Sequence, residues 1–463
     1  MRNIDATKGP ITKNMMKLAW PIAVSNLANV FYNIADTFFV GQLENSADAI
    51  AAVTVAFNVV FLLVAFAIGL STATTTLISQ YFGAKDHENL EKTVHTSIIV
   101  IFSLAIVVTV TGILTKQWIF KILQTDPEVI PLADEYFTII MVGMFFMFTF
   151  YVFQSMLRGV GDTKTPMVAS VISNIINIVL DPFLIYGWLF FPKLGVAGAA
   201  YATVIARALL SFYLFYKIIQ KDCPLGVKMR HFRIDFKIAK EIFRIGIPSS
   251  LSEMSVAFGT MLILGRMNTF GSVATAAHGI GTRFDSLLYL PMAAIGQASA
   301  TMVGQNLGAR QRERAFKTAT QSMKFIFISI AALTLLFIIF ARPLLSAFTN
   351  DPGVVDLGRF YFYYHFSFFC FPGLRVAMIF AFYGAGDSRS VFITTLISLF
   401  VLRVPLAYLF SYTKLGPSGM WLGMGLSHFL TVIIMFFIFR TKKWMEKAIV
   451  LREDNPEKDI AAD

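Results

Sequence analysis

The sequence has few charged residues and few cysteines. Only 14% of its 463 residues are charged, whereas 56% are hydrophobic. A soluble domain carries about 25% charged residues, and its compact core could not bury this much apolar surface. The composition therefore disfavours a soluble enzyme and a disordered chain. The two cysteines, Cys223 and Cys370, form no disulfide framework and do not have the spacing of a metal site.

The sequence also lacks the motifs of common enzymes. It contains no HExxH, no Walker phosphate-binding loop and no Gly-x-Ser-x-Gly nucleophile elbow. The segment GVGDTKT at 159–165 slightly resembles a phosphate loop, but its glycine spacing is wrong and no strand precedes it. We interpret it as a structural turn at a helix end. We expect no enzymatic activity and no cofactor.

Long apolar runs dominate the chain. An apolar run of about 20 residues spans a bilayer as a helix. The sequence therefore predicts an all-α polytopic membrane protein with twelve transmembrane helices. The predicted spans are roughly 14–41, 51–82, 93–114, 132–157, 167–187, 195–219, 241–265, 274–305, 318–341, 354–380, 391–411 and 417–440.

The basic residues are distributed unevenly between the predicted loops. If the N-terminus is cytoplasmic, the loops on the opposite side carry only seven of the 39 basic residues: Lys116, Lys121, Lys193, Arg266, Arg342, Arg359 and Lys414. This bias is the positive-inside rule, and it predicts a cell-membrane protein with both termini in the cytoplasm. The net charge of +11 thus reflects topology, and we expect no nucleic-acid partner. The basic connection at 221–240 is either a solvated linker that sets orientation or a contact for anionic headgroups.

The sequence repeats itself at an offset of 225 residues. SQYFGAK at 79–85 matches GQNLGAR at 304–310, TDPEVIPL at 125–132 matches NDPGVVDL at 350–357, and GVGDTKT at 159–165 matches GAGDSRS at 384–390. Each half holds six spans, so the two halves have the same orientation. We expect an amino-terminal lobe at 1–220, a linker at 221–240, a carboxy-terminal lobe at 241–445 and a polar cytoplasmic tail at 446–463. Two such lobes around a central cavity are typical of transporters.

Ionisable residues inside the spans are candidates for function, because burying them in a membrane is costly. Asn177 and Asp181 are four residues apart and share one helix face. Together with Asp36 and Thr203 they supply a cluster of oxygens. Two neighbouring carboxylates in a low dielectric cannot both ionise freely, so the cluster suits a shared proton. It also suits Na⁺. Alternatively, each acid stabilises a helix break, which Pro182 supports at Asp181.

The second half offers weaker candidates. Glu253, about one turn after Pro248, is a second candidate for ion coupling. We interpret Arg283 and Asp285 as a structural pair that partly neutralises itself. The histidines show no metal-ligand spacing, and we interpret buried ones such as His365 and His428 as core residues.

Several motifs together resemble the multidrug and toxic compound extrusion (MATE) family. They are WPIAVSNLANVFYNIADTFFVGQL in span one, LRGVGDTKTPM, NIINIVLDP and GVAGAAYAT around spans four to six, and LPMAAIGQASATMVGQNLGA in span eight. The resemblance covers about residues 12–440. It implies a rocker-switch antiporter that exports cationic amphipathic compounds in exchange for H⁺ or Na⁺, and we expect a monomer. A lipid-linked precursor flippase of the same wider superfamily is the alternative.

The resemblance also implies roles for individual residues. Asp36 corresponds to the coupling acid of the first span, and Pro21 to a proline at which that span bends. The partners of the coupling acid correspond to Asn177, Asp181, Ala199 and Thr203. Positions of the substrate pocket correspond to Asn33, Tyr136 and Gln154. Span ten carries Arg375 and no acid, which favours the branch of the family whose coupling site lies in the amino-terminal lobe.

Overall fold

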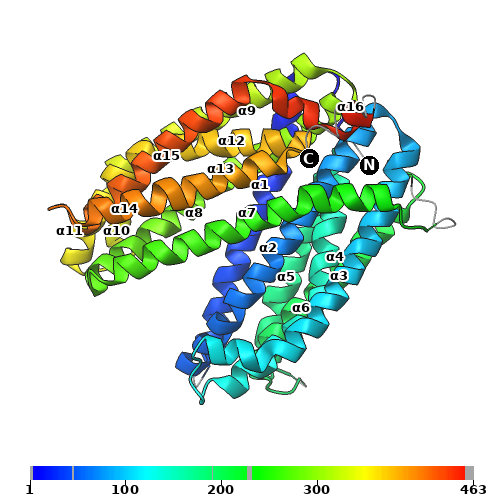
Figure 1. The fold of residues 1–463 in the computed structure, drawn as a ribbon. Coiled ribbons are helices and arrows are strands. Elements are labelled where there is room, and N and C mark those ends of the chain that lie inside the picture. Colours follow the sequence, from blue (N-terminus) through cyan, green and yellow to red (C-terminus); the bar gives the residue numbers. More distant parts are fainter. Residues whose placement is uncertain (1–3, 44–45, 190, 227–231, 454–463) are drawn as a thin grey trace. The chain divides into compact units, whose positions relative to one another are not determined.

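The computed structural model describes residues 4–43, 46–189, 191–226 and 232–453. This part of the chain is helical and contains no β-strand (Figure 1). The long helices of its first half are α1 (Ile11–Val40), α2 (Ser46–Ala84), α3 (His87–Ile122), α4 (Ile130–Gly159), α5 (Lys164–Tyr186) and α6 (Val196–Ile219). Those of its second half are α7 (Phe236–Asn268), α8 (Ser272–Gly308), α9 (Arg312–Ile339), α12 (Cys370–Ala385) and α15 (Pro417–Arg440).

Shorter elements complete the second half. Two π-helices, η2 (Tyr361–His365) and η4 (Ile397–Arg403), lie within longer helical stretches. The stretch around η2 consists of α11 (Pro352–Phe360), η2, the 3₁₀ turn η3 (Phe366–Phe368) and α12, and the stretch around η4 joins α13 (Ser388–Leu396) to α14 (Val404–Ser411). The remaining elements are α10 (Ala341–Ser346), η5 (Lys443–Lys447) and α16 (Ile449–Glu453).

The number of membrane-crossing helices agrees with the sequence. Among the described residues, 10 helices are long and apolar enough to cross a membrane, and the pair Pro352–Phe368 and Cys370–Ala385, bent by 47°, makes an eleventh. The twelfth is α1, which is 30 residues long but less apolar, because Asn26, Asn29, Asn33 and Asp36 interrupt it. The predicted twelve-helix membrane fold is therefore confirmed.

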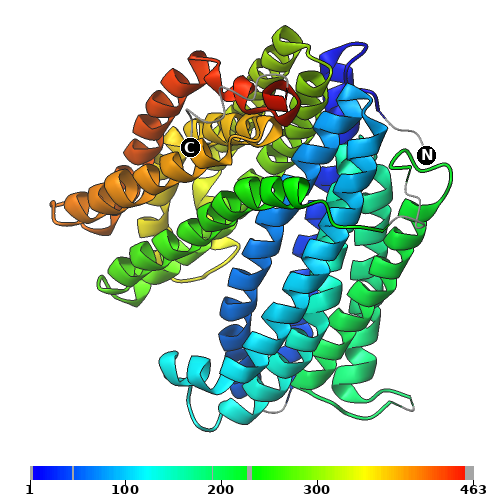
Figure 2. The same cartoon turned by 45° about the vertical axis from the view of Figure 1, so that its right-hand side comes forward.

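The helices group into two compact units. The first contains Val24–Phe82 and Asp86–Ser250 together with Ile4, and the second contains Asp5–Ala23, Gly83–Lys85 and the chain from Leu251 onward. Within the first unit, α4 packs against α6 and α3, and α5 packs against α6 (Figure 2). Within the second unit, α8 packs against α12 and α9, and α14 packs against α15.

These units differ from the predicted lobes at two helices. The first part of α1, up to Ala23, groups with the second unit, and the first part of α7, up to Ser250, groups with the first unit. Each change of unit comes two residues after a proline, Pro21 in α1 and Pro248 in α7. A proline removes one helical hydrogen bond, so each helix is weakened close to the point where it passes from one unit to the other.

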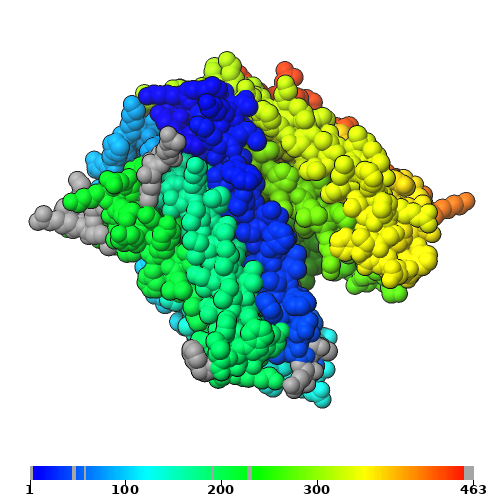
Figure 3. Space-filling model, turned by 180° about the vertical axis from the view of Figure 1, so that it is seen from behind, coloured from blue at the N-terminus to red at the C-terminus, as the bar shows by residue number. Residues whose placement is uncertain are grey.

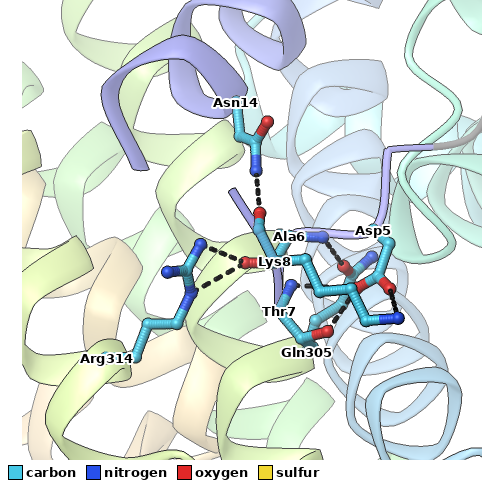
Figure 4. A network of polar contacts seen from close by, with 7 residues as sticks. All are labelled: Asp5, Ala6, Thr7, Lys8, Asn14, Gln305 and Arg314. Carbon is cyan, nitrogen blue, oxygen red and sulfur yellow. Dashed lines mark hydrogen bonds and ion pairs between the residues drawn. The ribbon is translucent and has the colours of Figure 1, made fainter. Parts of the chain in front are cut away.

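The segment before α1 is bound to the second unit by polar contacts (Figure 4). The backbone N–H of the buried Ala6 donates to Gln305 Oε1 at 2.9 Å. The guanidinium of Arg314 donates to the Ala6 carbonyl from Nε at 3.2 Å and from Nη2 at 3.1 Å. Within α1, the Thr12 hydroxyl donates to Gln321 Oε1 of α9 at 3.5 Å. In Figure 3 the dark blue start of α1 accordingly lies beside yellow-green residues of the second unit.

The carboxy-terminal residues also pack on the second unit. Trp444, Met445 and Ala448 are buried in an apolar cluster with Phe382 and Phe439. The beginning of the predicted polar tail is therefore part of the folded core, because these residues are apolar. Residues 454–463 of the tail and residues 227–231 of the predicted linker lie outside the described residues.

Matching turns show the repeat at the level of the backbone. Gly161 and Gly386 have φ values of +83° and +85°. After each glycine an aspartate side chain caps the next helix: Asp162 accepts from the Thr165 N–H at 3.0 Å, and Asp387 accepts from the Ser390 N–H at 3.4 Å. The segment GVGDTKT is thus a helix-ending turn, as the sequence analysis predicted, and the structure adds that an aspartate caps the following helix.

Candidate functional site

A stripe of buried polar residues runs along α5 in the first unit. Ser170, Ser173, Asn174, Asn177 and Asp181 are all buried. Their spacing of three or four residues places them on one side of the helix, and α5 packs against α6. The remaining positions of α5 are mainly apolar. The helix therefore directs its polar residues toward the protein interior, as transmembrane helices with functional polar groups do.

Residues of α1, α5 and α6 are linked through this stripe. The Tyr32 hydroxyl lies 3.1 Å from the Thr203 hydroxyl, and Asn177 Nδ2 donates to Thr203 Oγ1 at 3.3 Å. Nearby, Asn174 Nδ2 donates to Asn29 Oδ1 at 3.0 Å. A small pocket at this point is lined by Tyr32, Ser173, Asn174, Asn177, Thr203, Ala206 and Arg207.

The two carboxyl groups of the site have few protein partners. Asp181 is 0% exposed, and neither of its carboxylate oxygens has a hydrogen-bond partner. Asp36 Oδ1 is buried and also has none. The two residues are close enough to interact electrostatically. A buried ionised carboxylate without donors costs several kcal/mol or more, so this arrangement favours binding of a proton or a cation.

Two further predicted residues lie at the same place. Tyr136 of α4 is buried and interacts electrostatically with Asp36 and Asp181. Ala199 of α6 is buried one turn before Thr203 and so lies on the same side of that helix. The structure thus gathers Asp36, Asn177, Asp181, Thr203 and Tyr136, while their role in ion coupling stays a prediction.

Other predicted residues lie elsewhere. Asn33 is exposed on α1. Gln154 follows Tyr136 by 18 positions on the same helix, so about 27 Å of helix separates them. Its side-chain oxygen accepts from Arg158 Nη2 at 2.7 Å. Tyr136 and Gln154 therefore lie far apart along α4, and their place in a substrate pocket stays a prediction. Pro21 lies inside α1, in the part that groups with the second unit.

The sequence analysis did not assign three residues of the site: Tyr32, Asn174 and Arg207. Arg207 Nη2 lies 3.5 Å from Asn174 Oδ1, and its guanidinium carbon is 4.9 Å from the centre of the Phe150 ring and 5.7 Å from that of Tyr32. The sequence did contain a signal for two of them. Asn174 precedes Asn177 by three positions and Arg207 follows Thr203 by four, so each shares a helix face with a predicted site residue.

The second-unit candidate, Glu253, has a different environment. It lies on α7 and interacts electrostatically with Arg375 of α12. Arg375 in turn donates from Nη2 to the Thr395 hydroxyl at 3.1 Å. The charged group that interacts with Glu253 is thus the basic Arg375, whereas the charged group that interacts with Asp181 is a second acid, Asp36. The described residues contain no group of three or more His, Cys, Asp and Glu residues that could hold a metal ion.

The family model named MatE matches the chain twice, over residues 21–183 and 248–409. This chain belongs to the MatE family. The two matches fall on the two sequence repeats, and together they cover more than half of the chain. The resemblance found in the motifs is therefore confirmed, and the protein is a multi-pass membrane transporter of a multidrug-efflux family rather than an enzyme.

Similar proteins cover nearly the whole chain. "Probable multidrug resistance protein YpnP" from Bacillus subtilis (strain 168) is 28% identical over 445 residues, which cover 96% of this chain and 98% of that protein. An "FAD transporter" from Shewanella oneidensis (strain MR-1) is 27% identical and covers 93% of this chain and 94% of its own. A solved structure described as "Crystal structure of MATE in the bent conformation" has a TM-score of 0.88 and 28% identity, covering 96% of this chain and 98% of that one.

Proposed function

We propose that this MatE-family protein is a secondary antiporter that exports cationic amphipathic compounds in exchange for H⁺ or Na⁺. The coupling ion binds at Asp36 and Asp181. The observation that carries this proposal is the environment of Asp181, which is fully buried, has no hydrogen-bond partner on either oxygen and lies next to a second acid. We further propose a monomer in the plasma membrane with both termini in the cytoplasm.

The coupling follows from charge. With both acids ionised, the site attracts a cationic substrate. Binding of a proton or Na⁺ from the outside removes part of this attraction, so the substrate leaves outward. The lobes then rock, α1 bends near Pro21, and the ion is released inside. A one-for-one exchange of H⁺ or Na⁺ for a monovalent cation moves no net charge, so the concentration gradient of the ion drives export, and a tenfold ion gradient, worth about 1.4 kcal/mol, supports a substrate ratio of about ten.

The same residues are compatible with either ion. A proton needs only the two carboxylates. Na⁺ is a hard cation that prefers several oxygen ligands, and the carboxylate oxygens of Asp36 and Asp181, Asn177 Oδ1 and the Thr203 hydroxyl are available for it. Asn177 Oδ1 is buried and has no hydrogen-bond partner, which supports Na⁺ as a serious candidate.

The experiment that tests the proposal separates the two ions. The purified chain is reconstituted into liposomes loaded with a fluorescent cationic compound, and H⁺ and Na⁺ gradients are imposed one at a time. Efflux driven by one gradient identifies the coupling ion. If neither gradient changes the efflux rate of an intact preparation, the antiport proposal is wrong.

A second candidate substrate class is aromatic compounds that carry phosphate. One relative is described as an FAD transporter, and the pocket in the first unit contains Arg207 beside Tyr32. An arginine near an aromatic ring suits a planar anionic ligand. The same liposomes loaded with FAD decide between the classes, because exclusive export of FAD would contradict the preference for cations.

A further inference from the structure

The second unit contains a buried polar cluster that the proposed antiport does not use. Asp285 Oδ2 of α8 accepts a hydrogen bond from the Tyr361 hydroxyl at 2.7 Å and lies 3.4 Å from His365 Nε2. The ring of His365 is 5.6 Å from that of His428, measured between centroids, and His428 Nδ1 lies 3.0 Å from Arg403 Nη2. These five residues form a continuous series from α8 through η2 to α15 and η4.

Both π-helices of the unit supply residues to this cluster. Tyr361 and His365 are the first and last residues of η2, and Arg403 is the last residue of η4. A π-helix is rare and occurs mostly at functional sites, because its wide turn is less stable than an α-helical turn. In η2 this turn brings Tyr361 and His365 to the same carboxylate. The local distortion is thus associated with the polar cluster.

The second unit has three buried histidines. Hydrogen bonds from donor groups keep two of them, His278 and His428, in the neutral state. A guanidinium can only donate, so His428 Nδ1 accepts from Arg403. The indole N–H of Trp421 can also only donate, so His278 Nδ1 accepts from it at 3.3 Å. Adding a proton at either Nδ1 would break that hydrogen bond. At His428 it would also place a second positive charge against Arg403.

His365, in contrast, faces a hydrogen-bond acceptor instead of a donor. Its Nε2 faces the Asp285 carboxylate, and its Nδ1 is buried without a hydrogen-bond partner. The ring can therefore donate from Nε2 to Asp285 and receive a proton at Nδ1, after which an imidazolium lies against a carboxylate. A carboxylate that orients an imidazole and stabilises its charged form is a common device in proteins.

The acid is the more exposed member of the pair. The side chain of Asp285 is 26% exposed, whereas that of His365 is 2% exposed. Asp285 Oδ1 is buried and has no hydrogen-bond partner, so this oxygen can still accept a hydrogen bond. The charged and titratable groups around the pair are His278 on α8, Tyr361 on η2, Arg375 on α12, Arg403 on η4 and His428 on α15.

We propose that Asp285 and His365 form a second proton-binding site, in which His365 Nδ1 takes the proton and Asp285 provides the counter-charge. Arg375 and Arg403 are both basic, so Asp285 is the group that makes a charged His365 acceptable in this surrounding. The site lies entirely in the second unit and does not depend on the antiport proposal.

The test is a histidine titration by NMR. The full chain, labelled with ¹⁵N-histidine, is reconstituted in nanodiscs and titrated between about pH 5 and about pH 9, the range in which imidazoles normally change charge. We expect one buried imidazole to titrate and its resonance to disappear in His365→Gln. In Asp285→Asn, His365 loses its counter-charge, and we expect it to stay neutral throughout this range.

A matched control is His428→Gln, whose amide oxygen can still accept from Arg403. This variant should leave the titration of His365 intact. The proposal is overturned if the His365 resonance does not change with pH, or if it titrates identically in Asp285→Asn. Should His365→Gln not fold, substitution of the other histidines one at a time assigns the resonance by elimination. The readout requires no transport, so a failure of gradient-driven efflux would leave it unchanged.

Discussion

Replacing Asp181 with asparagine should separate transport from stability. Asparagine has nearly the same size as aspartate but carries no titratable charge. Because Asp181 is fully buried and its carboxylate has no hydrogen-bond partner, the substitution breaks no protein contact. Asparagine keeps an acceptor oxygen and adds an NH₂ group, but it removes a charge whose burial without donors costs several kcal/mol. We therefore expect Asp181→Asn to be at least as stable as the unmodified protein in a thermal melt in detergent.

Transport should change in the opposite direction. Without the acid, the ion gradient no longer drives export, and the substrate ratio of about ten that a tenfold ion gradient supports should fall to about one. Efflux from liposomes measures this loss, and Glu128→Gln, at an exposed loop residue, is the control. Two results would refute the reasoning: full efflux by Asp181→Asn, or a destabilisation of more than about 2 kcal/mol, which is typical of losing a buried structural partner.

Four further outcomes are expected. Reporters placed at Lys237 and after Lys447 should both be cytoplasmic, and labelling of either from outside would contradict the topology. Glu253→Gln should retain more transport than Asp36→Asn, because Arg375 already acts on Glu253; equal loss in folded protein would place coupling in the second unit as well. Gly161→Ala should cost about 1–2 kcal/mol in a thermal melt, because φ is +83° and the new Cβ would meet the Ile4 carbonyl, whereas Gly226→Ala, with free space around it, lacks that clash. Burial raises the pKa of the Cys223 thiol, so its alkylation at neutral pH should be slower than that of a free thiol and should accelerate as pH rises; a rate equal to that of free cysteine would contradict its burial.

The sequence predicted the helices and the repeat well, because both depend on local patterns. Apolar runs give the length of a membrane helix directly, and the spacing of Asn177 and Asp181 shows that they share a face. The spacing does not show which helix packs there, so Tyr32 was left unassigned. The resemblance implied a bend of the first span at Pro21, but not that α1 and α7 pass from one unit to the other close to Pro21 and Pro248.

The cluster around Asp285 was not predicted for a related reason. Asp285 was assigned to a structural pair with its neighbour Arg283, and His365 to the core, because each was judged from its own segment. The two residues are 80 positions apart, and the π-helical turn that directs His365 toward Asp285 leaves no mark on the hydropathy pattern. Contacts between distant segments depend on how the helices pack, and no local sequence pattern shows that packing.

The polar composition of α1 has a consequence for biosynthesis. A helix enters the membrane from the translocon in proportion to its hydrophobicity, and each asparagine or aspartate near its centre makes entry less favourable. α1 contains Asn26, Asn29, Asn33 and Asp36 and is not among the helices apolar enough to cross a membrane unaided, whereas α2 is. The first helix should therefore wait at the translocon until α2 has been synthesised, and the two should enter the bilayer as a pair. The residues that equip α1 for transport thus make its insertion depend on its neighbour.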